Sequence, residues 1–469
     1  MPQPPLPPLP RRRTARRTPA APARVTPRSP TAVLAAVLTS VLALGAAAPA
    51  GAAAPTGEAG NPYAGARGYV NPEWSARAAA EPGGEAVAGQ PTAVWLDEIA
   101  DIGGRGDAMG LRDHLDAALA QNAGLVQLVL YDLPGRDCER ENPSGELGPA
   151  ELDRYKREFV DPTAGILADP DYADLRIAAV VEPNSLPRLI TNTGSAWNAT
   201  FTCETVKENG AYVQGVGYAL AELGALPNVH PYLDISHHGL LGWEENRDAA
   251  ARLLYETAAR ADAVDLVRGV TTNVADYSVL HEEHFGADDT VNGVHVRQSR
   301  WVDWNPHVDE VPYALAFRDE LVRLGFGRDL GVVVDTSRNG WGGPGRPAGP
   351  GPRNGSVDDY VDGSRLDRRI SLGNWCNQDG AGLGERPAAA PEPGIDAYAW
   401  IKNPGISDGT GEPSPVDVRP HQPMCDPAYG RPPRGSSTPS GAVPGAPPAG
   451  EWFPAYFRML LANAWPPLP

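Results

Sequence analysis

The feature that most constrains this chain is a series of seven short apolar runs separated by stretches with helical spacing. Several runs are continuously apolar, as expected for parallel strands buried on both faces. The stretches between them, such as 106–122, 211–223 and 248–264, repeat apolar residues at helical intervals. Alternating strands and helices predict a parallel α/β sheet, and this many units predict a closed or nearly closed barrel. The predicted strands are AVWLDE (93–98), LVQLVLYDL (125–133), LRIAAVVEP (175–183), HPYLDIS (230–236), LVRGVTTNVA (266–275), DLGVVVDTS (329–337) and AYAWIKN (397–403).

A doubly wound open sheet is the competing fold. Its dinucleotide-binding form requires a G-x-G-x-x-G turn after the first strand. No such turn follows residues 93–98.

Each predicted strand ends in a polar residue. In a parallel barrel the side chains at this rim converge on one cleft, where active sites lie. For any single residue, a helix cap or turn role is the simpler explanation. Seven together predict a polar, mostly acidic cleft. The rim residues are Asp97, Asp132, Glu182, Asp234, Asn273, Asp335 and Lys402.

Charge and cysteine content narrow the classes of partner. The 469 residues carry a net charge of −18, although the first 54 contain seven arginines and no acidic residue. Such an acidic body repels nucleic-acid phosphates and anionic lipids, so neither is an expected partner. Four cysteines suit two disulfides on a large fold.

The first 54 residues have the pattern of a secretory signal peptide. Arginines precede an apolar run from Thr31 to about Ala48, which small residues follow. A membrane anchor is the alternative, because the run approaches the length that spans a bilayer. We expect cleavage, export, and a Gly/Ala/Pro-rich spacer over 55–90.

Several reaction classes lack their motifs. The histidine pairs His237–His238 and His281–His284 do not have zinc-site spacing, and no metal or cofactor is expected. Neither the G-x-S-x-G elbow nor a P-loop occurs. Carboxylates remain, together with tryptophans on or just beyond strand ends, and indole faces stack on sugar rings. A secreted barrel with both predicts a glycosidase, with core packing as the alternative for each tryptophan. These are Trp95, Trp243, Trp341, Trp375 and Trp400.

Seven motifs then identify a family by resemblance. They are YDLPGRDC (131–138), VVEPNSLPRLITN (180–192), YLDISHHGLLGW (232–243), TTNVADYS (271–278), VVVDTSRNGWGG (332–343), LGNWCN (372–377) and WIKNPGISDGT (400–410). In order and spacing they resemble glycoside hydrolase family 6, the secreted cellobiohydrolases and endoglucanases that cleave β-1,4-glucan (cellulose). The resemblance runs from about residue 92 to 464 and makes 91–469 the catalytic domain. It implies a distorted, TIM-like α/β barrel, an inverting mechanism without a metal, and disulfides Cys138–Cys203 and Cys376–Cys425.

The resemblance also implies roles for individual residues. Asp137 matches the carboxylate that tunes the general acid and helps relay protons, and Asp408 matches the proposed base or its stabiliser. Tyr131 would contact the distorted sugar. Arg136 and Arg338 would keep the carboxylates charged. The implied substrate contacts are Trp95, Trp243 and Trp375 for stacking and Asp234, His237 and Lys402 for hydroxyls, and the rim adds Asp97 and Asn273.

The chain departs from the family pattern at the general acid. The aspartate of the family's EPDS motif is Asn184 here, and an amide cannot release a proton near neutral pH. Losing a general acid costs about 10²–10⁴-fold in rate. Further departures are Gly135 for Asp, Pro143 for a water-associated Ser, Leu240 for a stacking Trp, Asp276 for Asn and Ile406 for Glu.

Three functions remain open. The first is a β-1,4-glucan hydrolase in which Asp137 becomes the acid, or one that needs a good leaving group. The second is a non-catalytic glucan-binding pseudoenzyme, and the third is a barrel enzyme of unrelated chemistry. Long loops at 340–366 and 405–450 are predicted to roof the cleft, which favours a tunnel and cellobiohydrolase-like action over an open groove. A monomer is expected.

Overall fold

The computed structural model describes residues 60–412, 421–430 and 438–469. Its central sheet has the order β1-β2-β3-β4-β5-β8-β10-β9, in which only the β10–β9 pair is antiparallel. Six of the seven parallel strands lie inside a predicted run, and the seventh, β4, begins one residue before its run. The seven strands are β1 (Val94–Leu96), β2 (Leu125–Leu130), β3 (Arg176–Val181), β4 (Val229–Asp234), β5 (Gly269–Thr272), β8 (Gly331–Asp335) and β10 (Ala397–Ala399), followed in order by the short β9 (Ala388–Ala389).

The sheet curls until its first and last parallel strands nearly meet. A single bridge joins Thr92 to Trp400, and the backbone N–H of Ala93 donates to the carbonyl of Trp400 at 3.2 Å. The predicted nearly closed, distorted barrel is therefore confirmed.

The strands are continuously apolar because their alternate side chains enter two separate clusters. On β2 and β3, Leu128, Leu130 and Val181 belong to the large cluster beneath the helices. Their neighbours Val129 and Val180 belong to a second cluster inside the barrel. Burial on both faces removes the polar alternation that a half-exposed strand would show.

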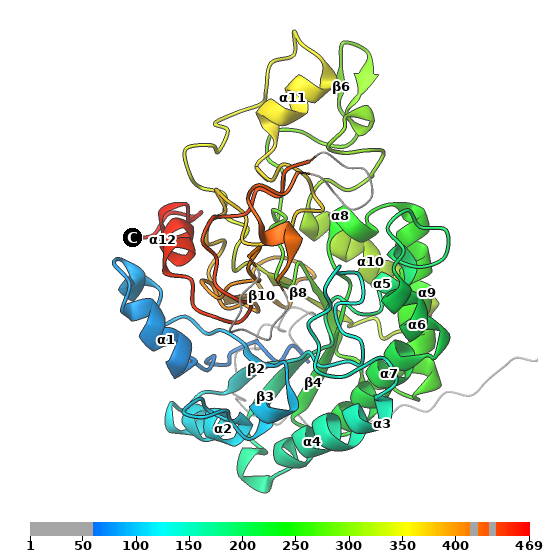
Figure 1. Ribbon diagram of the computed structural model, residues 1–469, viewed down its shortest axis with the longest axis vertical. Helices are drawn as coiled ribbons and strands as arrows, with labels where there is room; N and C mark the ends of the chain where they lie inside the picture. The colour runs from blue at the N-terminus through cyan, green and yellow to red at the C-terminus, as the bar shows by residue number, and fades with distance from the viewer. Residues whose placement is uncertain (1–59, 413–420, 431–437) are drawn as a thin grey trace, which may run out of the picture. The chain divides into compact units, whose positions relative to one another are not determined.

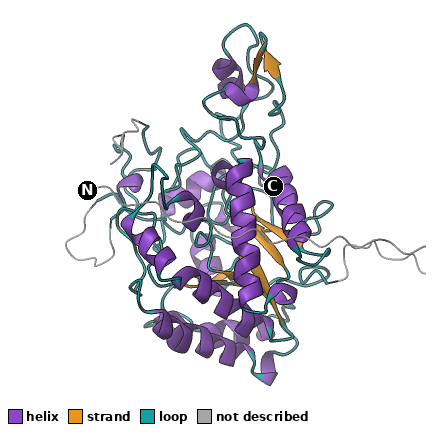
Figure 2. Ribbon diagram, turned by 90° about the vertical axis from the view of Figure 1, so that its right-hand side faces the viewer, coloured by secondary structure: helices purple, strands orange, loops and turns teal. Residues whose placement is uncertain are grey.

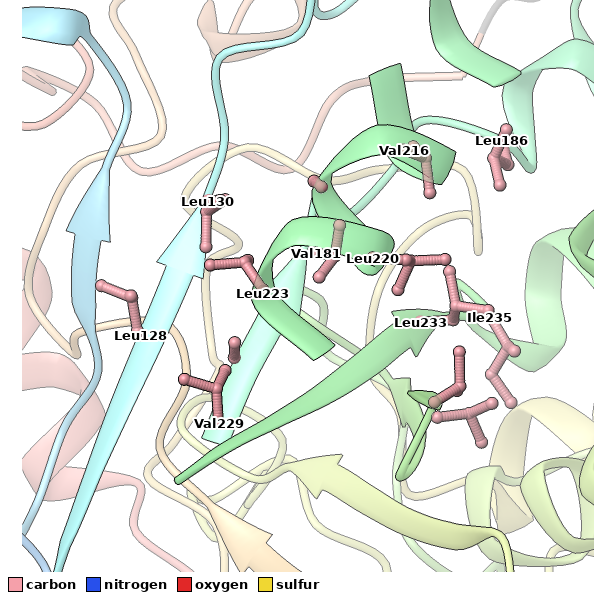
Figure 3. Close-up of a cluster of buried hydrophobic side chains, with 14 of the residues drawn as sticks. Leu128, Leu130, Val181, Leu186, Val216, Leu220, Leu223, Val229, Leu233 and Ile235 are labelled. Carbon is pink, nitrogen blue, oxygen red and sulfur yellow. The ribbon is translucent and has the colours of Figure 1, made fainter. Parts of the chain in front are cut away.

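Helices cover the outer face of the sheet. Figure 1 shows α2 (Leu111–Ala120), α4 (Asp161–Leu167) and α7 (Ala211–Gly224) along the outside of β2, β3 and β4. In Figure 3, Leu220 and Leu223 of α7 point toward Leu130, Val181 and Leu233. In Figure 2 long helices stand in front of the strands. The other helices are α1 (Pro72–Ala79), α3 (Leu152–Arg154), α5 (Arg188–Thr191), α6 (Phe201–Glu208), α8 (His238–Leu241), α9 (Glu244–Arg260), α10 (Glu310–Leu324), α11 (Val357–Ser364) and α12 (Pro454–Ala462).

The described part of the predicted spacer, 60–90, is folded. Asn71 caps α1, and Trp74 on this helix is 2% exposed and packs edge-on against Trp400 and Phe457. The described part of this segment therefore contributes an indole to the core. The signal-peptide prediction for 1–54 lies outside the described residues.

The two long loops differ in what they do. Residues 340–366 were predicted to roof the cleft described below, but they do not line it. Helix α11 in this loop instead packs beside the hairpin of β6 (Thr290–Val291) and β7 (Val294–His295), around Phe285 and Tyr360. The 405–450 loop does contribute cleft residues and is tethered by Cys376–Cys425. Both implied disulfides, Cys138–Cys203 being the other, are confirmed. Within the described ranges, no helix is long and apolar enough to cross a membrane.

Candidate active site

A cleft opens over the carboxyl ends of the parallel strands and brings together residues from distant parts of the sequence. Its walls come from the segments after β1, β2, β3, β5 and β10 and from the 405–450 loop. Nine of the sequence-predicted site residues line it: Trp95, Asp97, Tyr131, Arg136, Asp137, Asn184, Trp375, Lys402 and Asp408.

The other five predicted residues do not line the cleft. Three of them contact residues that do line it: Arg338 contacts Asp408, Asp234 contacts Asn184, and His237 contacts Asp276. Asn273 donates to the carbonyls of Asp335 and Ser278, so it holds loops rather than substrate. Trp243 precedes α9, and its indole N–H donates to the carbonyl of Asp303 at 2.7 Å.

Asp137 is held in its charged state by three donors. The Tyr131 hydroxyl donates to Oδ1 at 2.6 Å, Arg140 Nη2 lies 3.1 Å from the same oxygen, and Ser144 donates to Oδ2. Burial alone would raise the pKa of Asp137, but Arg140 and Arg136, aided by these hydrogen bonds, lower it below the ordinary value. The hypothesis that Asp137 becomes the acid therefore requires a change around this carboxyl group, because the protein without substrate keeps it ionised.

The carboxylate of Asp408 is also held by cations and hydrogen-bond donors. Arg338 Nη1 donates to its Oδ2 at 2.7 Å, Lys402 Nζ lies 3.3 Å from Oδ1, and the backbone N–H of Asn377 adds a bond of 2.9 Å. Although burial opposes ionisation, Arg338 and Lys402 lower the pKa of Asp408. Its carboxylate is ionised and oriented.

Asn184 sits on a strained turn between β3 and α5. Its φ of 57° lies in the left-handed region, and its backbone N–H donates to Asp234 Oδ2 at 2.9 Å. Its side-chain amide makes no hydrogen bond to a residue that the structure describes, so it is free to contact a ligand. Burial raises the pKa of Asp234 to about 7, and its Oδ1 has no partner among the described residues.

Asp276 is a third ionised carboxylate of the cleft. Arg369 Nη1 donates to it at 2.6 Å, and His237 Nε2 lies 3.4 Å away. Burial opposes ionisation, but His237 and Arg369 lower the pKa of Asp276 to about 2. Sequence comparison had marked this position only as a departure from the family pattern.

Several rim carboxylates are structural rather than cleft residues, contrary to the predicted acidic rim. Asp335 accepts N–H bonds from Ala275, Ser337 and Lys402. Glu182 accepts from the N–H groups of Asp132 and Leu133 and from the Tyr155 hydroxyl. Burial raises the pKa of Asp132 to about 9 and that of Glu182 to about 7.

Two of the five highlighted tryptophans belong to the core. Trp341 and Trp400 are 1% and 0% exposed and lie in one cluster with Trp74 and Phe457. Core packing was the alternative weighed for each tryptophan, and it holds for these two.

Sequence reasoning missed a charged pair and a cation in the cleft. Glu139 pairs with Arg188 at 3.5 Å, and the guanidinium carbon of Arg140 lies 4.3 Å from the centroid of the Trp375 ring. All three charged residues line the cleft. The only sequence signal was the run of charges in RDCER (136–140), which is adjacent to Asp137.

Gly135 lies two residues before Asp137 in a backbone conformation that favours glycine. Gly135 has φ +73°, and a Cβ there would lie 2.8 Å from Val206, so an aspartate at this position would be strained. In the part of the chain that the structure describes, no group of three or more His, Cys, Asp or Glu side chains is arranged to hold a metal ion.

A curled parallel barrel whose mouth carries ionised carboxylates, arginines and indoles defines the class of glycosyl hydrolases. The chain belongs to glycosyl hydrolases family 6, whose model matches residues 64–464.

Named relatives agree with this family. The chain is 43% identical over 431 residues to Exoglucanase A of Cellulomonas fimi, a match that covers 87% of this chain and 48% of that protein. It therefore spans about half the length of this relative. It is 35% identical over 391 residues to a 1,4-beta-D-glucan cellobiohydrolase of Podospora anserina, covering 81% of this chain and 79% of the other.

Solved structures show the same fold. The catalytic domain of Cellulomonas fimi Cel6B matches with a TM-score of 0.83 at 42% identity, covering 87% of this chain and 96% of that one. A Humicola insolens cellobiohydrolase in complex with glucose and cellotetraose matches with a TM-score of 0.65 at 28% identity, covering 87% and 100%.

Proposed function

We propose that this protein is a secreted β-1,4-glucan (cellulose) hydrolase of cellobiohydrolase type that works by inversion, with an amide in the position of the general acid. One observation carries the proposal: Asp137, Asn184, Asp408 and two indoles line a single cleft. The relatives named above as exoglucanase and cellobiohydrolase support the substrate class. The protein is proposed to act as an extracellular monomer.

Each wall of the cleft has a separate task in this proposal. Trp95 and Trp375 offer aromatic faces to glucosyl rings, while Lys402 and Asp97 supply a donor and an acceptor for hydroxyls. Asp408, oriented by Arg338, stabilises positive charge that develops at the anomeric carbon.

Proton delivery is the weak step. The leaving oxygen needs a proton as the glycosidic bond breaks, and Asn184 can only donate a hydrogen bond. Asp137, the other candidate, is ionised in the free protein because Arg140 and Arg136 stabilise its charge. Turnover of unactivated glucan should therefore be slower by about 10²–10⁴-fold than with a positioned acid.

Contacts across the cleft favour action at chain ends. Gln422 Nε2, in the 405–450 loop, donates to the carbonyl of Asn142 at 2.6 Å, and Asn142 Nδ2 donates to the carbonyl of His421 at 2.8 Å. These bonds join the 405–450 loop to the loop after β2, and a bridged roof restricts entry to a chain end.

The alternative function is a glucan-binding pseudoenzyme. The amide at 184 and the ionised state of Asp137 favour it, because each removes a proton donor. The binding groups, Trp95, Trp375 and Lys402, would serve either function equally.

Restoring the carboxyl group tests the proposal. We expect Asn184→Asp to raise cellotetraose hydrolysis by about 10²–10⁴-fold, with cellobiose as the product. An aryl cello-oligosaccharide with a good leaving group should gain much less, because its departure needs no proton. Asn122→Asp, at an exposed position outside the cleft with a similar left-handed φ of 52°, is the charge-matched control.

The outcomes separate the two functions. Slow but measurable hydrolysis by the natural protein, accelerated by Asn184→Asp, supports the weakened hydrolase. Tight binding of cellotetraose without hydrolysis by either variant supports the pseudoenzyme. Fast hydrolysis by the natural protein that Asn184→Asp does not improve would contradict the role given to position 184.

A further inference from the structure

Arg140 occupies the aromatic face on which a sugar would stack. Its guanidinium carbon lies 4.3 Å from the centroid of the Trp375 ring, and both residues line the cleft. Its Nη2 lies 3.1 Å from Asp137 Oδ1, while its Nε is buried without a hydrogen-bond partner among the described residues. One side chain thus contacts both an indole platform and a buried carboxylate.

The contact between Arg140 and Trp375 cannot persist when the same face of the indole binds a sugar. A guanidinium over an indole and a pyranose ring on an indole use the same π surface. The side chain of Arg140 is 18% exposed, so it is accessible from the cleft. A planar cation can slide off the ring, whereas Trp375 is fixed next to the disulfide at Cys376.

We propose that Arg140 is a specificity-determining residue that a β-1,4-glucan chain must displace from Trp375, and that this displacement releases Asp137 from one of its two arginines. The inference rests on the proposed function, because it requires glucan in this cleft. Displacing Arg140 makes binding less favourable, and only ligands that stack on Trp375 offset this loss of binding free energy.

The release changes the balance of charges around Asp137. Arg136, Tyr131 and Ser144 remain as stabilisers of the carboxylate, and burial opposes its charge. Three ionisable acids on the neighbouring elements, Asp97, Glu139 and Asp408, act on its arginines and also oppose that charge, whereas Asp132, with a pKa of about 9, is neutral. Removing Arg140 therefore raises the pKa of Asp137, and the complex takes up protons. A protonated Asp137 in the same cleft as Asn184 is the donor that the free protein lacks.

Calorimetry with cellotetraose tests the inference without requiring turnover. We expect Arg140→Met to bind cellotetraose about tenfold more tightly than the natural protein, the size expected for a partly desolvated cation–π contact. Titrations at about pH 5 in buffers of different ionisation enthalpy should show proton uptake by the natural protein. Arg140→Met should take up fewer protons, because its Asp137 has already lost that arginine.

Two further variants keep the test decisive. Arg346→Met is the matched control, since Arg346 also lies over an indole, 4.1 Å from the Trp465 centroid, but outside the cleft. It should change neither affinity nor proton uptake. Should Arg140→Met fold poorly, Arg140→Lys keeps a charge near Asp137 without a planar group over the ring, and a gain of several-fold is expected.

The possible failures are distinguishable. Weaker or unchanged affinity in both Arg140 variants, with normal binding by the natural protein, overturns this inference and leaves the proposed function intact. Unchanged proton uptake in a variant that binds tightly overturns the link to Asp137. If neither the natural protein nor Arg346→Met binds cellotetraose, the proposed function and this inference both fail.

Discussion

The side chain of Arg338 holds both a cleft carboxylate and a backbone turn in place. It is fully buried, donates to Asp408 and to the carbonyl of Ala275, and lies over the Tyr277 ring at 4.3 Å. Ala275 has a left-handed φ of 57°, a conformation that costs free energy and persists only where surrounding contacts enforce it. Arg338 is one of those contacts.

Arg338→Met should therefore be strongly destabilising. It leaves Asp408 with Lys402 as its remaining cationic partner, and breaking a buried ion pair costs about 3–5 kcal/mol. Chemical denaturation followed by fluorescence gives the change in unfolding free energy. Arg300→Met, which breaks an exposed pair with Asp358, should cost at most about 1 kcal/mol. Equal losses in the two variants would contradict the role given to burial.

At the scale of elements, buried carboxylates join the ends of neighbouring strands. Glu182, after β3, accepts from the backbone after β2, and Asp335, at the end of β8, accepts from the segments after β5 and β10. These bonds fix the loops that carry Asp137, Asn184 and Lys402. A barrel rim can thus be acidic in sequence and still present few acids to the cleft.

This arrangement predicts a loss of stability with rising pH. The folded protein keeps protons on Glu182, with a pKa of about 7, and on Asp132, with a pKa of about 9, that the unfolded chain releases near pH 4. The free energy of unfolding should fall as pH rises from about 4 through 7 to 9, since folding then requires proton uptake.

Asp132→Asn should flatten that dependence. The amide cannot ionise, so the loss of stability between pH 5 and pH 9 should shrink by at least about 1 kcal/mol, measured by urea denaturation at both values. Asp153→Asn, at an exposed position of α3, is the control and should preserve the slope. An unchanged slope in Asp132→Asn would contradict a neutral Asp132 in the folded state.

At the scale of the whole domain, the segment 60–90 connects to residues several hundred positions away. The indole N–H of Trp74 donates to the carbonyl of Pro404 at 2.8 Å, and its ring packs against Phe457 on α12. Trp74 also lines the cleft. The N-terminal segment therefore supports both the core and the residue that precedes the 405–450 loop.

Trp74→Ala should destabilise the domain by about 3–5 kcal/mol, because it leaves a large cavity among aromatic rings. Thermal unfolding measures the loss, and cellotetraose affinity should fall with it as the cleft wall loosens. Trp197→Ala is the size-matched control at a 75% exposed position and should lie within about 0.5 kcal/mol of the natural protein. Little effect of Trp74→Ala would indicate that 60–90 is a spacer after all.

The seven strands and the two disulfide pairings were predictable from sequence for a local reason. Burial on both faces leaves a continuous apolar run in the sequence, and the family motifs identify which cysteines pair. Neither prediction requires knowledge of side-chain orientation. The same runs placed Trp95, Asp137, Asn184 and Lys402 after strand ends, where a cleft forms. The 60–90 segment escaped prediction because one short helix with a single indole has too little periodicity to be recognised.

The sequence by itself determined the fold, the family and the amide at position 184, since each is a property of residue type and order. Only the tertiary structure decided that Asp132, Glu182 and Asp335 turn away from the cleft, and that Asp137 is ionised under Arg140. The direction of a side chain at a strand end depends on which backbone N–H groups and guanidinium groups approach it from other elements. Those approaches join positions far apart in the chain, and no local pattern encodes them.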